Sequence, residues 1–497
     1  MKETRGAGSP TIRSVAPRPG VVLLLTCGAT FLAFLDTTVV NVAFPALRTS
    51  YPDTSVATLS WVVSSYAVVL AALLTPAGRL ADVLGRKRVF LVSLLLFTAA
   101  SAANALAPNI EALIAARAVQ GAAAAGMIPA ALGLVLHETP PEKRTVALGV
   151  WGAAASAAAA AGPTLGGVLV EIDSWRAVFL INVPLGLALL VGGLRSLPAD
   201  RPTGRQLPDL VGTLVVTLGI GSFVGGLTEG SEWGWTSGRT LSALLGGVML
   251  AAYGLYRSRR HPAPAVETGL WQNRTFAAAN LTSLLAGIGM FAWLLSGPLF
   301  CATVWRYSVL DAGLAVTPGA VTSAIAAIIV GKRLSPAGQR AAVPVGLLMF
   351  TVTGVWMYLG VGAEREFLQV WLPAGALGGA ALGAAMTGLS TAAAMSVPGE
   401  KFATGIGLNT TARQLGGALG VAATAVILAE RGITGPLGFR EIFLFSGIAA
   451  AVAALSGLAL LRREPTPTAA QTAAPTDAPT DAPAADGHGA AALTTDR

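Results

Sequence analysis

Fourteen long apolar segments limit what this chain can fold into. Each is close to the 20 residues that an α-helix needs to cross about 30 Å of hydrocarbon. Hydrophobic residues make up 54% of the 497 residues and charged residues only 12%, whereas a typical soluble chain is roughly 25% charged. We therefore expect an all-α integral membrane protein with fourteen spans. The segments are 21–45, 57–77, 88–107, 112–136, 146–170, 176–194, 210–228, 240–256, 275–301, 312–331, 341–361, 367–395, 403–429 and 442–461.

The basic residues predict how these segments are oriented. With both termini on one side, 24 of the 33 lysines and arginines lie on that side, seven lie in the opposite loops, and Arg117 and Arg413 lie inside segments. The positive-inside rule then places both termini in the cytoplasm of a multi-pass protein of the cell (plasma) membrane. The net charge of +8 follows from this topology, so we expect no nucleic-acid partner.

One acid, Asp36, lies deep in an apolar segment, about fifteen residues or roughly 22 Å along a helix from Val21. The segmentation leaves the other 24 Asp and Glu residues in loops, tails or segment ends. A deep carboxylate either bonds to neighbouring hydroxyls, such as those of Thr37 and Thr38, and holds helices together, or binds and releases a proton. We favour proton binding, because ionisable groups inside membranes are usually functional.

Arg117 lies about six residues into its segment. Arginine does not easily lose its charge, so its side chain faces protein, water or a carboxylate, unless it snorkels to the membrane interface. Gln120 and the small residues beside it indicate close packing against another helix. Arg413 poses the same alternatives in the second half of the chain.

The cysteines and histidines do not predict a metal site or a cofactor. Cys27 and Cys301 lie in apolar runs, and His137, His261 and His488 are scattered along the chain. Two cysteines make neither a disulfide framework nor a four-ligand zinc site.

The stretch GRLADVLGRKR at 78–88 combines two glycines, an acid and a basic cluster. The glycines permit a tight turn and close helix approach. We expect Asp82 to pair with basic partners and to sit at a helix N-terminus, holding one side of the bundle together. The residues of this motif are Gly78, Asp82, Gly85, Arg86 and Lys87.

The stretch GPTLGG sets three glycines around a proline, as Gly162, Pro163, Gly166 and Gly167. Glycines on one face let helices pack closely, and Pro163 supplies a bend suited to a hinge. A generic packing face would explain Gly162 and Gly166 alone, but the complete cluster is more specific.

Four motifs together resemble the major facilitator superfamily, specifically its fourteen-helix drug:proton antiporter branch. GRLADVLGRKR is similar to the family's loop between helices 2 and 3, with Val83 where arginine is usual. LIAARAVQGAAAA resembles helix 4, whose arginine, here Arg117, is implicated in proton coupling, although Ala123 stands where glycine is usual. GVWGAAASAAAAAGPTLGGVL resembles the antiporter motif of helix 5 apart from Ala158, and LDTTVVNVAFPAL resembles the helix-1 signature with its aspartate.

The resemblance implies two six-helix halves plus two additional central spans. An internal repeat supports this, because GKRLSPAGQR at 331–340 repeats the glycine spacing of the 78–88 motif. We divide the chain into a cytoplasmic N-terminal arm (1–20), an N-terminal half (21–195), a linker with two spans (196–274), a C-terminal half (275–462) and a disordered cytoplasmic tail rich in Ala, Pro and Thr (463–497).

We expect proton-coupled efflux of a hydrophobic or amphipathic small molecule, such as a drug or a self-made antibiotic, by alternating access. Asp36 and Arg117 would couple the proton. The expected partners are the substrate, protons and the lipid bilayer, and the protein is expected to act as a monomer without cofactors. Residues expected to line the cavity are Asn41, Gln120, Met290, Phe291, Trp293, Phe350, Trp356 and Arg413.

Two other functions stay open on the sequence alone. A proton-coupled symporter importing a small metabolite would use the same fold. An integral membrane enzyme would need several polar groups at one depth, whereas the segments supply one deep acid and no histidine.

Because that acid faces one or two intramembrane arginines, we expect a neutral, zwitterionic or weakly acidic substrate.

Overall fold

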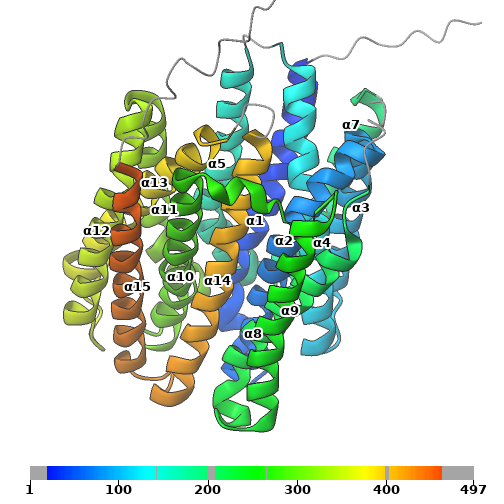
Figure 1. Cartoon of the computed structure of the whole chain (residues 1–497). Coiled ribbons are helices and arrows are strands. Elements are labelled where there is room, and N and C mark those ends of the chain that lie inside the picture. The colour runs from blue at the N-terminus through cyan, green and yellow to red at the C-terminus, as the bar shows by residue number, and fades with distance from the viewer. Residues whose placement is uncertain (1–18, 141–142, 199–206, 265, 398–401, 462–497) are drawn as a thin grey trace, which may run out of the picture. The chain divides into compact units, whose positions relative to one another are not determined.

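The computed structural model describes residues 19–140, 143–198, 207–264, 266–397 and 402–461 (Figure 1). Within these ranges every regular element is helical. Nearly all of the predicted N-terminal arm and all of the predicted C-terminal tail lie outside the described residues, so the structure does not test them.

Seven helices fill the predicted N-terminal half. Ser55 and Asn109 begin two of them, since each side chain accepts a hydrogen bond from a backbone N–H three residues on. Gly85 ends α2 and begins α3 with a φ of 98°, which favours glycine. The helices are α1 (Pro19–Ser50), α2 (Val56–Leu84), α3 (Arg86–Ala105), α4 (Ile110–Glu138), α5 (Arg144–Ile172), α6 (Ala177–Leu180) and α7 (Asn182–Ser196).

Two helices, α8 (Leu210–Trp233) and α9 (Gly238–Arg260), form the additional pair. Asp209 caps α8 and accepts hydrogen bonds from Arg257 of α9 at 2.7 and 2.9 Å. Although burial raises the pKa of the Asp209 carboxyl, the bonds from Arg257 and Gly212 outweigh it and hold the pKa below its usual value.

The C-terminal half begins after a short helix, η2 (Thr268–Gln272). Ser335, which stands in the 331–340 repeat where Asp82 stands in the 78–88 motif, caps a helix here by accepting a hydrogen bond from the Gly338 N–H. The helices are α10 (Arg274–Thr303), α11 (Val309–Arg333), α12 (Pro336–Gly360), η3 (Phe367–Trp371), α13 (Leu372–Met395), α14 (Phe402–Arg431), α15 (Pro436–Gly457) and η5 (Leu458–Leu461).

The fourteen predicted segments each correspond to one span. In the described ranges, thirteen helices are long and apolar enough to cross a membrane, counting α6 with α7 and η3 with α13 as single spans. At 29 residues, α5 has the length for a fourteenth. The prediction of a fourteen-span helical protein is therefore confirmed.

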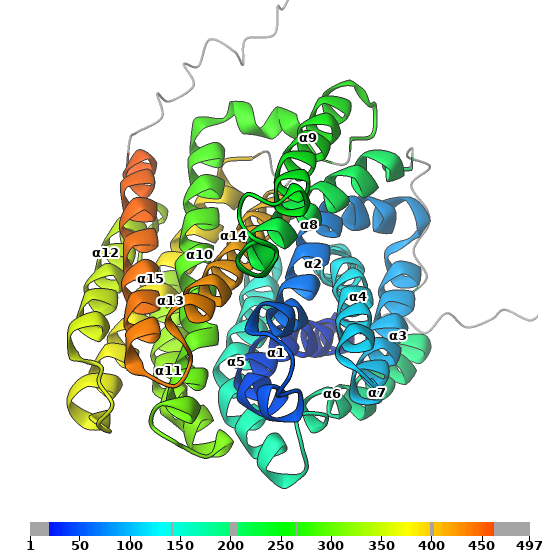
Figure 2. The ribbon, with the colours of Figure 1, turned by 90° about the horizontal axis from the view of Figure 1, so that it is seen from below.

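Helix pairing repeats between the first six spans and the last six. The contacts α1–α5, α2–α4, α3–α4 and α3–α7 recur as α10–α14, α11–α13, α12–α13 and α12–α15. The two sets meet where α2 packs on α14 and α5 packs on α11. The additional helix α8 lies beside both α2 and α14, and α9 packs against α8 (Figure 2).

The span ends define two faces. The Trp305 face carries the connections 51–55, 106–109, 173–176, 234–237, 304–308, 361–366 and 432–435. The opposite Asp82 face carries the other described span ends and both ends of the described chain, Pro19 and Leu461.

The apolar core differs between the two faces. One cluster near the Trp305 face joins both halves, from Phe44 and Trp175 to Phe300, Trp305 and Phe443. Towards the Asp82 face, α1 to α4 and α10 to α15 have separate clusters. In this state the halves are therefore packed together most continuously at the Trp305 face.

Candidate functional site

The Asp36 carboxylate lies at the meeting point of α1, α4 and α7. Arg117 donates to its Oδ2 at 2.5 Å, while Gln120 and Asn182 donate to Oδ1 at 3.0 and 3.1 Å. All four residues are at most 1% exposed. The predicted pair of Asp36 and Arg117 is thus in direct contact, inside the protein and away from water.

A second layer from α3 completes this network. Ser101 accepts hydrogen bonds from Gln120 and Asn182 and donates to the carbonyl of Phe179. Asn104 donates to the Gln120 side chain at 2.7 Å. The side-chain oxygens of Asn104 and Asn182 are buried and accept no hydrogen bond in this state, which leaves two unused acceptors beside the ion pair.

The structure separates the alternatives for Asp36 and Arg117. Thr37 and Thr38 donate to carbonyls of their own helix, so they are not the partners of Asp36. Arg117 does not snorkel, because it is 1% exposed, donates to the Val62 carbonyl and lies 4.3 Å from the Tyr66 ring centre. The close helix packing predicted there is present.

Sequence reasoning missed Ser101, Asn104 and Asn182 as members of the network. Their only signal was an amide or hydroxyl inside an apolar segment. It also placed Glu229 in a loop, whereas Glu229 lies inside α8, is 9% exposed and accepts a hydrogen bond from Trp61 of α2 at 3.0 Å. That assignment was wrong because the apolar segment ends at 228, whereas α8 continues to Trp233.

The GPTLGG stretch lies where α5 touches both halves. A Cβ on Gly162 would overlap Thr38, and one on Gly166 would lie 3.2 Å from the Val39 carbonyl of α1. On the other side, a Cβ on Gly167 would lie 3.0 Å from the Leu310 Cα of α11. Thr164 and Thr317 share a 2.8 Å hydrogen bond between α5 and α11.

Pro163 lies at the same contact, since a Cβ on Gly313 of α11 would press on its carbonyl. The stretch is therefore a three-helix junction of α1, α5 and α11. Its use as a hinge stays a prediction.

The 78–88 motif joins α2, α3 and α4. Asp82 lies in the last turn of α2 rather than at a helix N-terminus, and it accepts hydrogen bonds from Arg86 at 2.9 and 3.1 Å. Arg86 also donates to the Gly133 carbonyl of α4, and Lys87 donates to the carbonyl of Leu197. Gly78 packs against Pro129 of α4.

Seven of the eight residues predicted to line the cavity divide into three groups. Gln120 belongs to the buried network. Asn41, Phe291 and Phe350 are at most 4% exposed, and the Phe350 ring packs 5.2 Å from that of Trp293. Three are partly exposed: Met290, Trp293 and Arg413.

Trp356 does not fit the prediction. It is 39% exposed and belongs to a stripe of exposed apolar residues on α12 at spacings of three and four. Such a stripe is the face that a spanning helix turns to lipid, so we no longer count Trp356 among the cavity residues. The stripe also contains Val345, Leu348, Val352, Val355 and Leu359.

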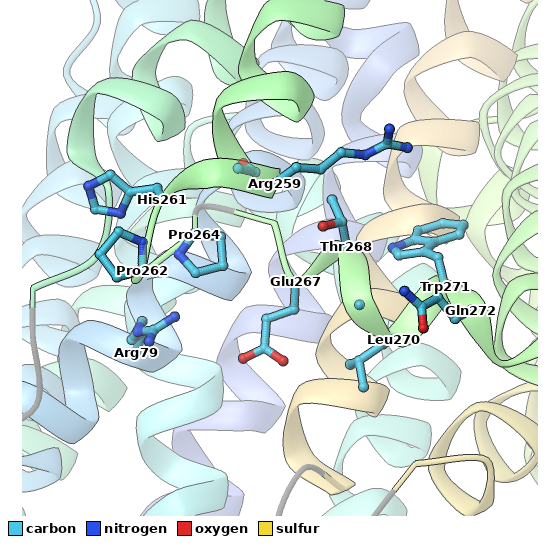
Figure 3. Close-up of a pocket in the computed structure, with 12 residues that line it drawn as sticks. Arg79, Arg259, His261, Pro262, Pro264, Glu267, Thr268, Leu270, Trp271 and Gln272 are labelled. Carbon is cyan, nitrogen blue, oxygen red and sulfur yellow. The ribbon is translucent and has the colours of Figure 1, made fainter.

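A cavity of about 830 Å³ lies at the Asp82 face, away from all of these residues. Figure 3 shows Arg79, His261 and Pro262 on one side of it, Trp271 on the other, and Glu267 between them. It lies between the end of α9, η2 and the end of α2. Among the described residues, no group of three or more His, Cys, Asp and Glu side chains could hold a metal ion.

Comparison with known proteins agrees with this fold. The profile of the Major Facilitator Superfamily matches residues 26–421 and 279–492. The chain belongs to the major facilitator superfamily. It is therefore a multi-pass membrane transporter of small molecules, and the enzyme alternative is excluded.

Similar proteins carry antibiotic-related names. A probable actinorhodin transporter of Streptomyces coelicolor is 34% identical, over 84% of this chain and 73% of that protein. The tetracenomycin C resistance and export protein of Streptomyces glaucescens is 30% identical, over 86% of this chain and 79% of that protein. The chain is thus related to antibiotic export proteins.

A solved structure supports the fold. A bacterial homologue of the human lysosomal transporter Spinster, in an inward-facing and unoccupied conformation, superposes with a TM-score of 0.63. The match covers 90% of this chain and 99% of that one, at 17% sequence identity.

Proposed function

We propose that this transporter exports a hydrophobic or amphipathic small molecule from the cytoplasm in exchange for protons. The observation that carries the proposal is the Asp36–Arg117 pair, buried at 1% exposure between α1 and α4. A buried ion pair is a poor source of stability, because desolvation of the two charges offsets their attraction. A charge-changing role explains its presence better.

The network is arranged for a carboxylate that can take up a proton. In this state each partner of Asp36 donates, so the charged form fits. A proton on Asp36 would remove the attraction to Arg117, which keeps its bonds to Val62 and Gln120. Rotation of the Asn182 amide would then offer its unused oxygen to the new O–H group.

Helix packing supplies a route from this proton to the seam between the halves. Thr38 and Val39, two and three residues beyond Asp36, lie against Gly162 and Gly166 of α5. The same stretch of α5 contacts α11 through Gly167. A shift of α1 on protonation would therefore press directly on the junction that holds the two halves together.

The direction of transport is the finer part of the proposal. The names of the similar proteins support export, but a symporter would use the same buried pair. Transport measured in vesicles of known orientation separates the two, because a symporter moves its substrate with the proton and an exporter moves it against the proton.

We test coupling with inside-out membrane vesicles from cells that express the chain. An energised vesicle is acidic inside, so an antiporter lets protons out when a transported compound is added, and a pH-sensitive dye reports it. We expect a response for some members of a compound panel and none for Asp36→Asn. Asp53→Asn, an exposed carboxylate in the loop after α1, should behave as wild type. A full response from Asp36→Asn would contradict the coupling role.

Orientation needs a separate measurement, motivated by the excess of basic residues on the Asp82 face. Reporter fusions after Arg201 and Gln471 should read cytoplasmic, and one after Trp233 should read external. A cytoplasmic reading at Trp233 would contradict this orientation.

A further inference from the structure

A second intramembrane arginine, Arg413, lies deep in α14. It is eleven residues from Phe402 and eighteen from Arg431, so about 16 Å and 27 Å from the two helix ends. These distances exceed the reach of an arginine side chain, so Arg413 does not snorkel to either membrane surface.

The surroundings of α14 show where the Arg413 side chain can be exposed. This helix packs against α10, α13 and α15 in one half and against α2, α4 and α8 on the other side. Helices of both halves therefore flank it, which favours an interior position, rather than a lipid-facing one, for the exposed part of a side chain on it. Arg413 is partly exposed.

The Arg413 guanidinium has no ion pair and no hydrogen bond among the described residues, in contrast to Arg117. The two acids buried inside described spans are both engaged: Asp36 holds Arg117, and Glu229 accepts from Trp61. A guanidinium stays charged and carries five N–H donors. At this depth its natural complement is an anion that enters from outside the chain.

The residues next to Arg413 add a polar and an apolar side. Asn409 lies one turn earlier on the same face; it donates to Ser283 at 2.7 Å, and its side-chain oxygen is buried without a partner. Next to it on α10, Gly287 packs against the Arg413 backbone, and Phe291 packs against Gly417. The α14 backbone at Arg413 is therefore packed on α10 between a polar residue, Asn409, and an aromatic one, Phe291.

We propose that Arg413 binds the acidic group of the substrate, so that the transported molecules are aromatic or otherwise apolar organic anions. The inference rests on the proposed export function and narrows its substrate class. The guanidinium donates to a carboxylate or an ionised hydroxyl of the substrate, and the apolar body packs against the α10 side, near the partly exposed Met290. The Asn409 oxygen accepts from a substrate hydroxyl beside the acid.

The test is equilibrium binding to purified protein in lipid nanodiscs at neutral pH, with protein-free nanodiscs as background. The probes are naphthoate, anthracenecarboxylate and biphenylcarboxylate, each compared with its own uncharged carboxamide. We expect wild type to bind at least one carboxylate more tightly than its carboxamide. Arg413→Gln should weaken the binding of that carboxylate by about tenfold or more. Affinity for the carboxamide should stay unchanged.

Two variants show whether the charge or the shape matters. Arg413→Lys should keep part of the carboxylate preference, since it retains the charge but not the forked donor. Arg431→Gln removes an exposed arginine of the same helix, paired with Glu441, and should bind as wild type does.

Three results would overturn the proposal. These are equal carboxylate binding by Arg413→Gln and wild type, an equal loss for carboxamide and carboxylate, or no carboxylate preference in wild type with any pair. Because no proton gradient is present, failure here leaves proton coupling standing, and failure of coupling leaves this site standing.

Discussion

The two six-helix halves use the same helix pairing but differ in the surroundings of their intramembrane arginines. In the N-terminal half, Arg117 is 1% exposed and is held by Asp36, Gln120 and the Val62 carbonyl. In the C-terminal half, Arg413 is partly exposed and bonds to no described residue. The arginine of the N-terminal half is paired with a carboxylate of the same half. The arginine of the C-terminal half has no such partner among the described residues.

The loops on the Asp82 face repeat this difference. Asp82 at the end of α2 and Arg86 at the start of α3 form an ion pair across the first of these connections. In the second, Ser335 caps α12, and Gln339 donates to the carbonyls of Gly331 and Leu334. The glycine spacing is therefore the same in both copies, but the second copy has the uncharged Ser335 and Gln339 where the first has the ion pair of Asp82 and Arg86. We infer that proton and conformational chemistry belong to the first half and substrate chemistry to the second.

The largest expected difference between the halves is in stability. Arg117→Gln leaves the Asp36 carboxylate buried without its charge partner, which should lower the free energy of unfolding by about 3–5 kcal/mol. Arg413→Gln removes no bond, so its change should stay within about 1 kcal/mol. Reversible unfolding in mixed detergent micelles measures both.

The double variant Asp36→Asn/Arg117→Gln supplies the control for that contrast. It removes both charges, so it should recover part of the stability lost by Arg117→Gln alone. Equal stability of Arg117→Gln and wild type would show that the two arginines do not differ in this way.

Helix contacts offer a second, smaller contrast. A Cβ on Gly416 of α14 would overlap the backbone carbonyl of Leu284, whereas one on Gly162 of α5 would overlap the Thr38 side chain. Backbone yields less easily than a side chain, so Gly416→Ala should cost about 1–3 kcal/mol and Gly162→Ala less. The same unfolding assay ranks them.

Thr38→Ala checks the cause at Gly162. Combined with Gly162→Ala it should restore part of the lost stability, because the obstructing hydroxyl is gone while the Cβ of residue 38 would still lie 2.7 Å away. If Gly162→Ala lowers the free energy of unfolding more than Gly416→Ala does, the expectation that obstruction by backbone costs more than obstruction by a side chain is wrong.

The smallest stability effects are expected at the two loops. Asp82→Asn removes a half-exposed ion pair, and Ser335→Ala removes a helix cap, so each should cost about 1 kcal/mol or less. Transport should nevertheless slow severely for Asp82→Asn, with substrate binding kept, and change little for Ser335→Ala. Uptake rates in vesicles with matched protein levels test this. A normal rate for Asp82→Asn would show that Asp82 and Ser335 do not differ in their effect on transport.

The spans could be predicted because hydropathy tracks the membrane directly. It does not track helix ends: α2 continues from the predicted 77 to Leu84 through polar residues, and α8 continues past 228 to include Glu229. A helix does not stop where lipid stops, since its backbone hydrogen bonds persist in water. That is why the burial of Glu229 escaped prediction.

Only the site residues that carry a charge, or that lie one turn from a charged residue, could be predicted. Asp36 and Arg117 stand out because an ion in hydrocarbon is costly, and Gln120 lies one turn from Arg117. Asn104 and Asn182 carry no charge, and their role depends on which helices converge on Asp36. That convergence is tertiary, and no local pattern encodes it.

The aromatic cluster at the Trp305 face has an optical consequence. Trp175 of the first half and Trp305 and Trp371 of the second are at most 5% exposed there. When this face opens in the transport cycle, water reaches these indoles, and their fluorescence should move to longer wavelength and become open to soluble quenchers. The protein therefore carries its own spectroscopic reporter of which face is open, readable in unlabelled protein while substrate and pH are changed.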